Sequence, residues 1–455
     1  MNEMRPADTV LRPILQRQTQ RGAGSLVVVM VLFFLMSLVA AYAGRNMIFE
    51  QRTSANQYRG TQAFEGAEGG VEWSLAMLNG GLVDAHCASS STGTNLRTRM
   101  LDVNATTGTV TPKYDATTSQ PLAAYCVSDP GSVTAPGTWT CGCPDTSTPA
   151  PIPAVPSNGP APAFKLTFQP AFRRPGLVQL VAQSCTRLDV SQYGCLNASA
   201  AQTAGDAVSV LSVLIAIKGG IAAAPLAALT ARGQINVTGA AAATLVNQDA
   251  SSYGITVDAG GSISFPSTSN FLGLAGAPPD ETKRDNDSSL PGTANNMFTS
   301  IFGMSRSTYK LQPAAIVLTC PAQCTASNLN LVAQRNPGRI IWLEGDAALT
   351  AGSNTDIGSA SAPVVIVAHG QLTKASTSSQ IRIFGLVYQY DDGTGSTAGK
   401  WVTAGDLYVQ GATVAEGDVT GTGNPTLVYD LGILNNLRLT GGSFVRVPGG
   451  WQDFQ

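Results

Sequence analysis

The chain has 455 residues, of which 12% are charged, and a formal net charge of −2. The low charge and the lack of a basic cluster argue against a nucleic-acid partner. Frequent Gly (48) and Pro (26) are typical of turn-rich β-structure. Only two histidines, His86 and His369, could serve acid–base or metal chemistry. We therefore expect no catalytic, cofactor or metal site, and a protein that is not an enzyme.

The first predicted element is a membrane-length helix. Residues 25–44 carry no charge, and twenty helical residues span the ~30 Å hydrocarbon core of a bilayer. Four arginines lie before this run, between residues 5 and 21, which predicts that the leading side stays cytoplasmic. A cleaved secretory signal with a small-residue site near residues 40–43 is an alternative, but the run is longer than a signal requires. A plain membrane anchor is the other alternative.

The helix is predicted to continue beyond the membrane segment, over residues 23–79 in total. Residues 46–79 contain no proline. One apolar stripe follows the helical period: Phe64, Ala67, Val71, Leu75 and Leu78. Gly66, Gly69 and Gly70 each weaken a helix by ~1 kcal/mol relative to Ala. Packing against a downstream sheet must therefore offset that cost.

Two motifs in this region resemble the PilX-type minor pilins of type IV pili. The first is QRGAGSLVVVMVLFF at residues 20–34, and the second is EQRTSANQYRGTQAFEGAEGGVEW at residues 50–73. The family carries a Q-R-G processing site followed by an E-x-R…N…R…AF-x-x-AE block. The matching positions are Glu50, Arg52, Asn56, Arg59, Ala63, Phe64, Ala67 and Glu68. The end of the chain, from residue 428, also resembles the end of larger PilX-type proteins.

The resemblance implies that a prepilin peptidase removes residues 1–22 by cutting after Gly22, which leaves Ala23 first. A cut between Gly24 and Ser25 is the alternative. The resemblance also implies a single-pass protein of the bacterial inner membrane, with its C-terminal bulk periplasmic, that later enters an extracellular fibre. The implied partners are other minor pilins and the major pilin through the helix, the inner-membrane assembly platform, and a large PilY-family tip adhesin.

Position 5 of the mature chain lacks the glutamate that most similar pilins carry. It is Val27 after the first cut and Val29 after the alternative one. A carboxylate in a bilayer costs a few kcal/mol, and in the family it pairs with the N-terminal amine of the neighbouring subunit. A subunit with nothing above it needs no such pair, which suggests a position at or next to the fibre tip. Family drift is the alternative.

Residues 80–219 are predicted to form an antiparallel β headpiece packed on the helix. Turn-rich segments separate its strand-like runs, and the Pro-rich residues 144–162 are expected to be a surface loop. The runs lie at 122–127, 138–143, 163–168, 176–185 and 207–217.

All eight cysteines follow the apolar run, which predicts disulfides in an oxidising compartment. Cys185 and Cys195 bracket the loop between the last two headpiece strands, so we expect them to pair. Cys320 and Cys324 are expected to close a tight local loop. Two bonds are expected among the remaining four: Cys87, Cys126, Cys141 and Cys143. The last two of these share one strand face and should not bond to each other.

Residues 220–455 are predicted to be mostly β, with an insertion at 276–335. Apolar strands begin at residues 340, 364, 383, 407 and 427, at intervals of 19 to 24 residues. This spacing suggests a β-solenoid, and an irregular β-sandwich is the alternative. The fold class is therefore α+β. Tyr388, Tyr390 and Trp401 could form either an interaction surface or the core of the strands.

The expected function is that of a minor pilin at or near the fibre tip, which primes pilus assembly and supports twitching motility. One alternative is a K-like pseudopilin of type II secretion, whose head is largely helical and typically binds calcium. Asp280, Asp285 and Asp287 lack the spacing of a calcium loop. A membrane-anchored β-solenoid enzyme acting on polysaccharide is the other alternative, and the low charge of residues 338–455 disfavours it.

Overall fold

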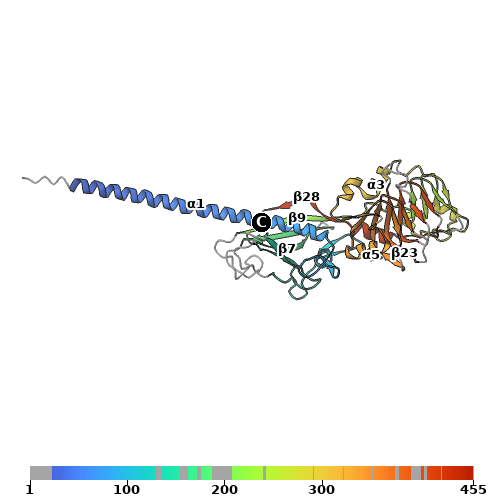
Figure 1. Cartoon of the computed structure of the whole chain (residues 1–455), viewed down its shortest axis with the longest axis horizontal. Coiled ribbons are helices and arrows are strands. Elements are labelled where there is room, and N and C mark those ends of the chain that lie inside the picture. The colour runs from blue at the N-terminus through green and yellow to red at the C-terminus, as the bar shows by residue number, and fades with distance from the viewer. Residues whose placement is uncertain are drawn as a thin grey trace, which may run out of the picture. The chain divides into compact units, whose positions relative to one another are not determined.

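The computed structural model describes residues 23–129, 131, 136–153, 162–171, 176–186, 207–238, 242–290, 292–320, 322–350, 353–374, 379–390, 401–403, 407–421 and 423–453. This part of the chain comprises a long N-terminal helix and a mostly β remainder (Figure 1). It divides into two compact units, Met1–Arg59 and Gly60–Gln455. The predicted leader, residues 1–22, lies outside the described residues.

Helix α1 spans Ala23–Leu78, close to the predicted bounds of 23–79. In the second unit, one side of the helix is buried in a hydrophobic core. Ala67, Val71 and Leu78 are at most 1% exposed, and Phe64 and Leu75 are partly buried against the same core. The predicted apolar stripe is thus confirmed.

Two of the glycines in this half of α1, Gly66 and Gly70, lie where the helix approaches the headpiece sheet. A β carbon at Gly66 would lie 2.3 Å from Ser184 Oγ, and one at Gly70 would lie 3.2 Å from the Phe164 ring. A β carbon at Gly69 would meet nothing within 4 Å. Close packing therefore explains Gly66 and Gly70, and it offsets their poor helix propensity.

The headpiece sheet has six antiparallel strands within the described residues. The strands are β5 (Ala123–Asp129), β6 (Thr138–Gly142), β7 (Ala163–Pro170), β8 (Leu177–Cys185), β9 (Val208–Lys218) and β28 (Ser443–Gln452). Their spatial order is β28-β9-β8-β7-β5-β6. Smaller elements join the helix to this sheet: β1 (Leu82–Val83), β2 (Thr94–Asn95), α2 (Leu96–Met100), β3 (Leu101–Val103) and β4 (Val110–Pro112). The antiparallel headpiece matches the sequence prediction.

The last strand of the chain belongs to the headpiece. Strand β28 pairs antiparallel with β9, with Ser443 opposite Lys218 (Figure 1). Residues 219–442 are therefore inserted between two neighbouring strands of one sheet, and we call them the inserted module. We predicted from the sequence that everything from residue 220 to the end belongs to the second domain. No local pattern indicates this return, because β28 pairs with a strand more than 200 residues earlier.

The inserted module consists mainly of parallel strands. They are β10 (Leu229–Ala231), β11 (Ile235–Val237), β12 (Thr244–Val246), β13 (Val257–Ala259), β14 (Ile263–Ser264), β15 (Asn270–Leu272), β16 (Lys283–Arg284), β17 (Ala315–Thr319), β18 (Ile340–Glu344), β19 (Ala347–Leu349), β20 (Thr355–Ile357), β21 (Val364–Ala368), β22 (Leu372–Lys374), β23 (Ile381–Gln389), β24 (Trp401–Thr403), β25 (Leu407–Ala415), β26 (Val419–Gly421) and β27 (Thr426–Tyr429). They form one 12-stranded and one six-stranded sheet in the described chain. Ile340 pairs with Val365 and Ile381 with Leu407, offsets of 25 and 26 residues.

The strand order within the module explains how both of its ends reach the headpiece. Strand β25, near the end of the module, pairs with β10 at its start, and Leu229 lies opposite Thr413. Strand β27 likewise pairs with β12. Because first and last strands are neighbours, the chain enters from β9 and leaves into β28 at the same place.

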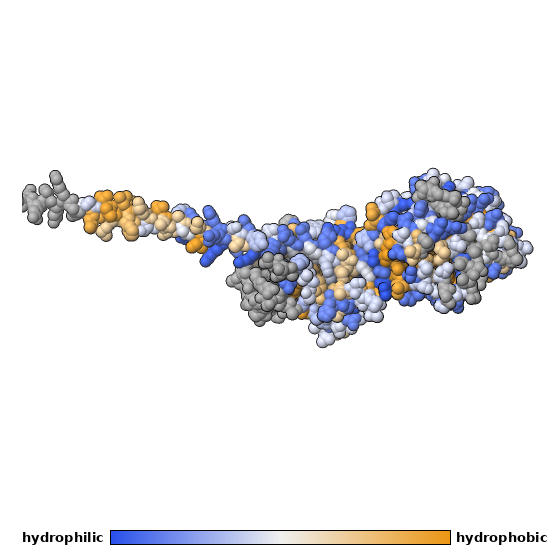
Figure 2. All heavy atoms as spheres, in the orientation of Figure 1, coloured by the Kyte–Doolittle hydropathy of each residue, from blue (hydrophilic) through white to orange (hydrophobic). Residues whose placement is uncertain are grey.

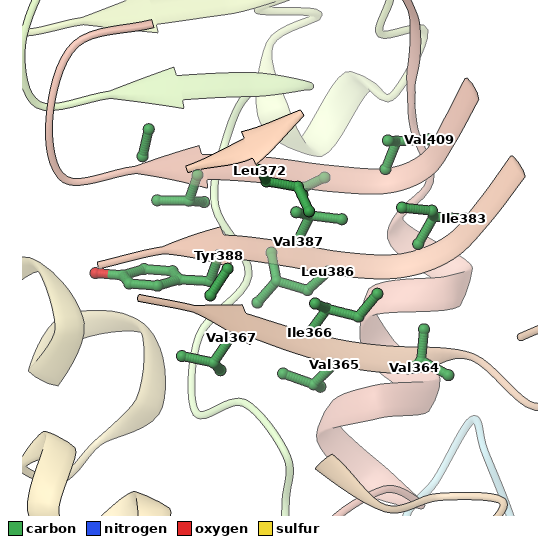
Figure 3. Packing of buried hydrophobic residues seen from close by; sticks show 14 of the residues in the cluster. Val364, Val365, Ile366, Val367, Leu372, Ile383, Leu386, Val387, Tyr388 and Val409 are labelled. Carbon is green, nitrogen blue, oxygen red and sulfur yellow. The ribbon is translucent and has the colours of Figure 1, made fainter. Parts of the chain in front are cut away.

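The module core is formed by apolar side chains of successive strands, with those of β21, β23 and β25 packed together in Figure 3. Helices from the predicted insertion at 276–335 cover part of it: α3 (Ala294–Phe302), α4 (Arg306–Lys310) and α5 (Ala326–Arg335). The last helix is α6 (Leu431–Leu439). Tyr388 and Tyr390 are only 0% and 6% exposed. They belong to the core, so of the two alternatives the core is confirmed for both tyrosines, and the side chain of Trp401 lies outside the described residues.

The headpiece and the inserted module each contain disulfides. Cys320 bonds to Cys324. Cys185 is disulfide-bonded, and its predicted partner, Cys195, lies outside the described residues. In the headpiece the two bonds are Cys87–Cys143 and Cys126–Cys141. The latter joins directly opposite residues of β5 and β6.

We expect Gly66→Ala to lower the free energy of unfolding by about 1–2 kcal/mol, since the new methyl group displaces the Ser184 hydroxyl from a buried hydrogen bond. That hydroxyl donates to the Ala163 carbonyl over 3.0 Å. The control Gly69→Ala should instead stabilise by up to about 1 kcal/mol through helix propensity. Denaturant unfolding of the full chain in detergent measures both.

Adding Ser184→Ala to Gly66→Ala removes the displaced oxygen and should recover most of the loss. Equal effects of Gly66→Ala and Gly69→Ala would contradict the close-packing explanation.

Candidate functional site

The candidate site is the apolar half of helix α1, residues 25–44, which we call the apolar half-helix. Its large side chains are exposed in the chain by itself, for example Phe33 (72%) and Met36 (69%). Figure 2 shows the apolar colour concentrated near the start of the helix. Its most apolar window has a mean hydropathy of 2.7, long and apolar enough to cross a membrane. Such a surface is stable only in lipid or against other apolar helices.

The apolar half-helix offers no charged side chain to a neighbour. The two position 5 candidates, Val27 and Val29, are 57% and 63% exposed. Because both side chains are uncharged, neither can form an ion pair. The first charged residue after Ala23 is Arg45, and the first carboxylate is Glu50. Contacts of this segment are therefore uncharged, and apolar packing dominates them, with Ser25, Ser37 and Tyr42 as the hydroxyl-bearing side chains. Gly22 lies outside the described residues, and Ala23 is the first residue of α1.

The motif that follows the apolar half-helix falls into two structural groups. Glu50, Arg52 and Asn56 lie on the exposed part of α1 in the first unit. Ala63 and Ala67, in the second unit, are fully buried. The motif thus combines polar side chains that are open to neighbours with small residues that allow the helix to pack on its own sheet.

The comparisons with known proteins address this same helix. Residues 21–72 match the PilX N-terminal family model. The match confirms the predicted resemblance of the N-terminal segment and points to a type IV pilin-like protein. Together with the apolar half-helix, it fits a membrane-anchored pilus subunit that interacts with other pilins. No curated protein and no solved structure matches the chain.

The PilX N-terminal match ends at residue 72. The predicted resemblance of the C-terminal end is therefore not supported by a family match. The C-terminal end nevertheless contacts the part of the chain that carries the match. Strand β28 belongs to the headpiece sheet, and Phe444 in it shares a hydrophobic core with Ala67 and Val71 of α1.

Two residues that the sequence analysis did not single out fasten the C-terminal end to the headpiece. Asn79 follows the last turn of α1, donates to the Phe444 carbonyl (3.0 Å) and accepts from the Phe444 amide (2.7 Å). Arg97 in α2 donates to the carbonyls of Thr440 (2.9 Å) and Gly442 (2.7 Å). A buried Asn or Arg leaves no periodic signal in a sequence, so neither role could be predicted.

The chemically active residue types are spread over the described part of the chain. Among the described residues, no group of three or more His, Cys, Asp or Glu side chains could hold a metal ion. His86 is exposed in a turn. His369 stacks on Tyr390 with 4.8 Å between ring centroids, and its Nδ1 lies 3.7 Å from a carboxylate oxygen of Glu344.

One pair of carboxyl groups has unusual electrostatics. Asp258 of β13 is 4% exposed and lies opposite Arg284 of β16. Burial raises the pKa of Asp258 to about 6, and the charge of Asp287 and a hydrogen bond to it contribute. Hydrogen bonds from Ser289 lower the pKa of Asp287. Asp280 and Asp287 therefore have different partners. Asp280 forms an ion pair with Lys283 over 2.8 Å, whereas Asp287 interacts with Ser289 and Asp258.

This pair predicts a pH dependence of stability. The folded-state pKa of Asp258 lies above its ordinary value, so its contribution to stability is present below about pH 4 and is lost as the pH rises through about 6. The melting temperature of the wild-type chain should fall more between pH 4.5 and pH 7 than that of Asp258→Asn. Asp285→Asn, at an exposed site, is the control. Parallel pH profiles for wild type and Asp258→Asn would refute the assignment.

Proposed function

We propose that the chain is a minor pilin that lies at or next to the tip of a type IV pilus and primes its assembly. The observation that carries the proposal is an exposed apolar half-helix with valine at position 5. Apolar contacts let the helix enter a bundle of sister helices. The missing carboxylate removes the ion pair with which a similar pilin docks beneath a subunit already in the fibre.

The route to the fibre follows from the same helix. A prepilin peptidase cuts after Gly22 in the bacterial inner membrane, and the C-terminal bulk is periplasmic at that stage. The assembly platform then transfers the subunit to the fibre, where α1 packs against other minor pilins and the major pilin. Exclusion of apolar surface from water drives this exchange of lipid for protein.

The inserted module supports a terminal position. It is a 224-residue insertion (219–442) between strands β9 and β28, and a subunit at the tip has no further subunit above it to accommodate. We interpret its parallel strand ladders, with offsets near 25 residues, as turns of a β-solenoid. This module is suited to present a PilY-family adhesin or to contact a surface, and its role is assembly and display rather than catalysis.

The test replaces Val27 with Glu in the full-length chain, expressed in a deletion strain of the source bacterium. The native chain should restore surface pili and twitching motility, and immunogold label should lie at fibre ends. Val27→Glu can pair with a neighbouring N-terminal amine, so label should spread along the shaft and priming should decrease. Val28→Glu is the control, since it adds the same charge to the bilayer at a position that cannot make this pair.

Native label distributed along the shaft would contradict the tip position. Priming by Val27→Glu that equals that of the native chain would remove the argument from the missing charge. Normal pili in the deletion strain would contradict a role in assembly.

A further inference from the structure

A cavity of about 270 Å³ lies where the headpiece meets the inserted module. Its walls come from α2, β3 and the residue after β4 on the headpiece side, and from the turns before β18 and after α6 on the module side. This volume is slightly below the usual range for small-molecule pockets, so the cavity can hold only a small ligand. The polar residues that matter to the argument are Arg97, Thr98, Asp102, Lys113 and Asn436.

Arg97 is a buried cation without a counter-charge. It is only 7% exposed, and its two terminal nitrogens donate to neutral carbonyls of Thr440 and Gly442. Its guanidinium carbon also lies 4.8 Å from the centroid of the Phe444 ring. Its enclosed Nε–H has no acceptor, and no carboxylate in the described part of the chain pairs with it. Burial, and next the positive charge of Arg339, lower the pKa of Arg97 to about 10. A buried unpaired charge is costly, and an anion in the cavity would compensate it.

A second cation lines the same cavity. The ammonium group of Lys113 donates one hydrogen bond to the Thr98 carbonyl over 2.6 Å, which leaves two of its three N–H groups for a ligand. The hydroxyl of Thr98 and the amide of Asn436 add neutral donors to the wall. The exposed carboxylate of Asp102 also lines the cavity and opposes an anion there.

We propose that this cavity binds a small oxyanion, a carboxylate or phosphate group, through Arg97 and Lys113. Arg97 and Lys113 place two positive charges on the wall of one cavity, and guanidinium and ammonium groups form strong charge-assisted hydrogen bonds with such an anion. The anion is either free in solution or part of a polypeptide. Because the walls belong to both the headpiece and the inserted module, the bound anion stabilises their junction.

The test uses isothermal titration calorimetry on the full chain in detergent, at constant ionic strength and pH 7. The probes are inorganic phosphate, N-acetyl-dialanine with a free carboxylate, and the same peptide as its amide. Saturable binding of phosphate alone identifies a free anion. Saturable binding of the carboxylate peptide, but not of the amide, identifies an anionic group of a polypeptide.

The variants give effects of opposite sign at neighbouring wall positions. Lys113→Gln should weaken binding about five- to tenfold, and Asp102→Asn should tighten it several-fold, because each changes the local charge by one unit. Lys165→Gln, on β7 and outside the cavity wall, should leave affinity unchanged. Matching melting curves show that the variants are folded. The proposal would be overturned if neither anion bound saturably. It would also be overturned if the affinity were the same in the native chain, Lys113→Gln and Asp102→Asn.

Discussion

The account depends on the exclusion of one apolar surface from water. About twenty residues of α1 expose large aliphatic and aromatic side chains and carry no charge. Such a surface must lie in lipid or among other helices, and this requirement fits a membrane-anchored pilus subunit. The second half of the same helix meets the requirement within its own chain, by packing Ala67, Val71 and Leu78 on the headpiece sheet.

The topology of the sheet gives the large second part of the chain a defined attachment. Residues 219–442 leave and re-enter the headpiece through paired strands, and Asn79 and Arg97 bind the returning segment by its backbone. A module held at both ends is more restrained than one on a single linker. In this arrangement the PilX-like segment and the inserted module are separate parts of one chain, and both ends of the module continue into neighbouring strands of the headpiece sheet.

Sequence reasoning succeeded where local periodicity carried the information. The stripe from Phe64 to Leu78 predicted which face of α1 is buried, because a helix repeats every 3.6 residues. The run of strands in the headpiece was likewise evident. The pairing of β28 with β9, the bond between Cys87 and Cys143 and the cavity beside Arg97 depend on contacts between distant residues, which no local pattern encodes. Tyr388 and Tyr390 show the same limit, since core and surface aromatics are alike in sequence.

The most direct test of the central claim is the intact mass and N-terminal sequence of the protein recovered from cell membranes and from sheared fibres. The account predicts the same mature chain in both fractions, beginning at Ala23 or at Ser25, with the apolar half-helix intact. A chain that still begins at Met1 in the fibre, or one that begins after Ala43 without its apolar half, would contradict it.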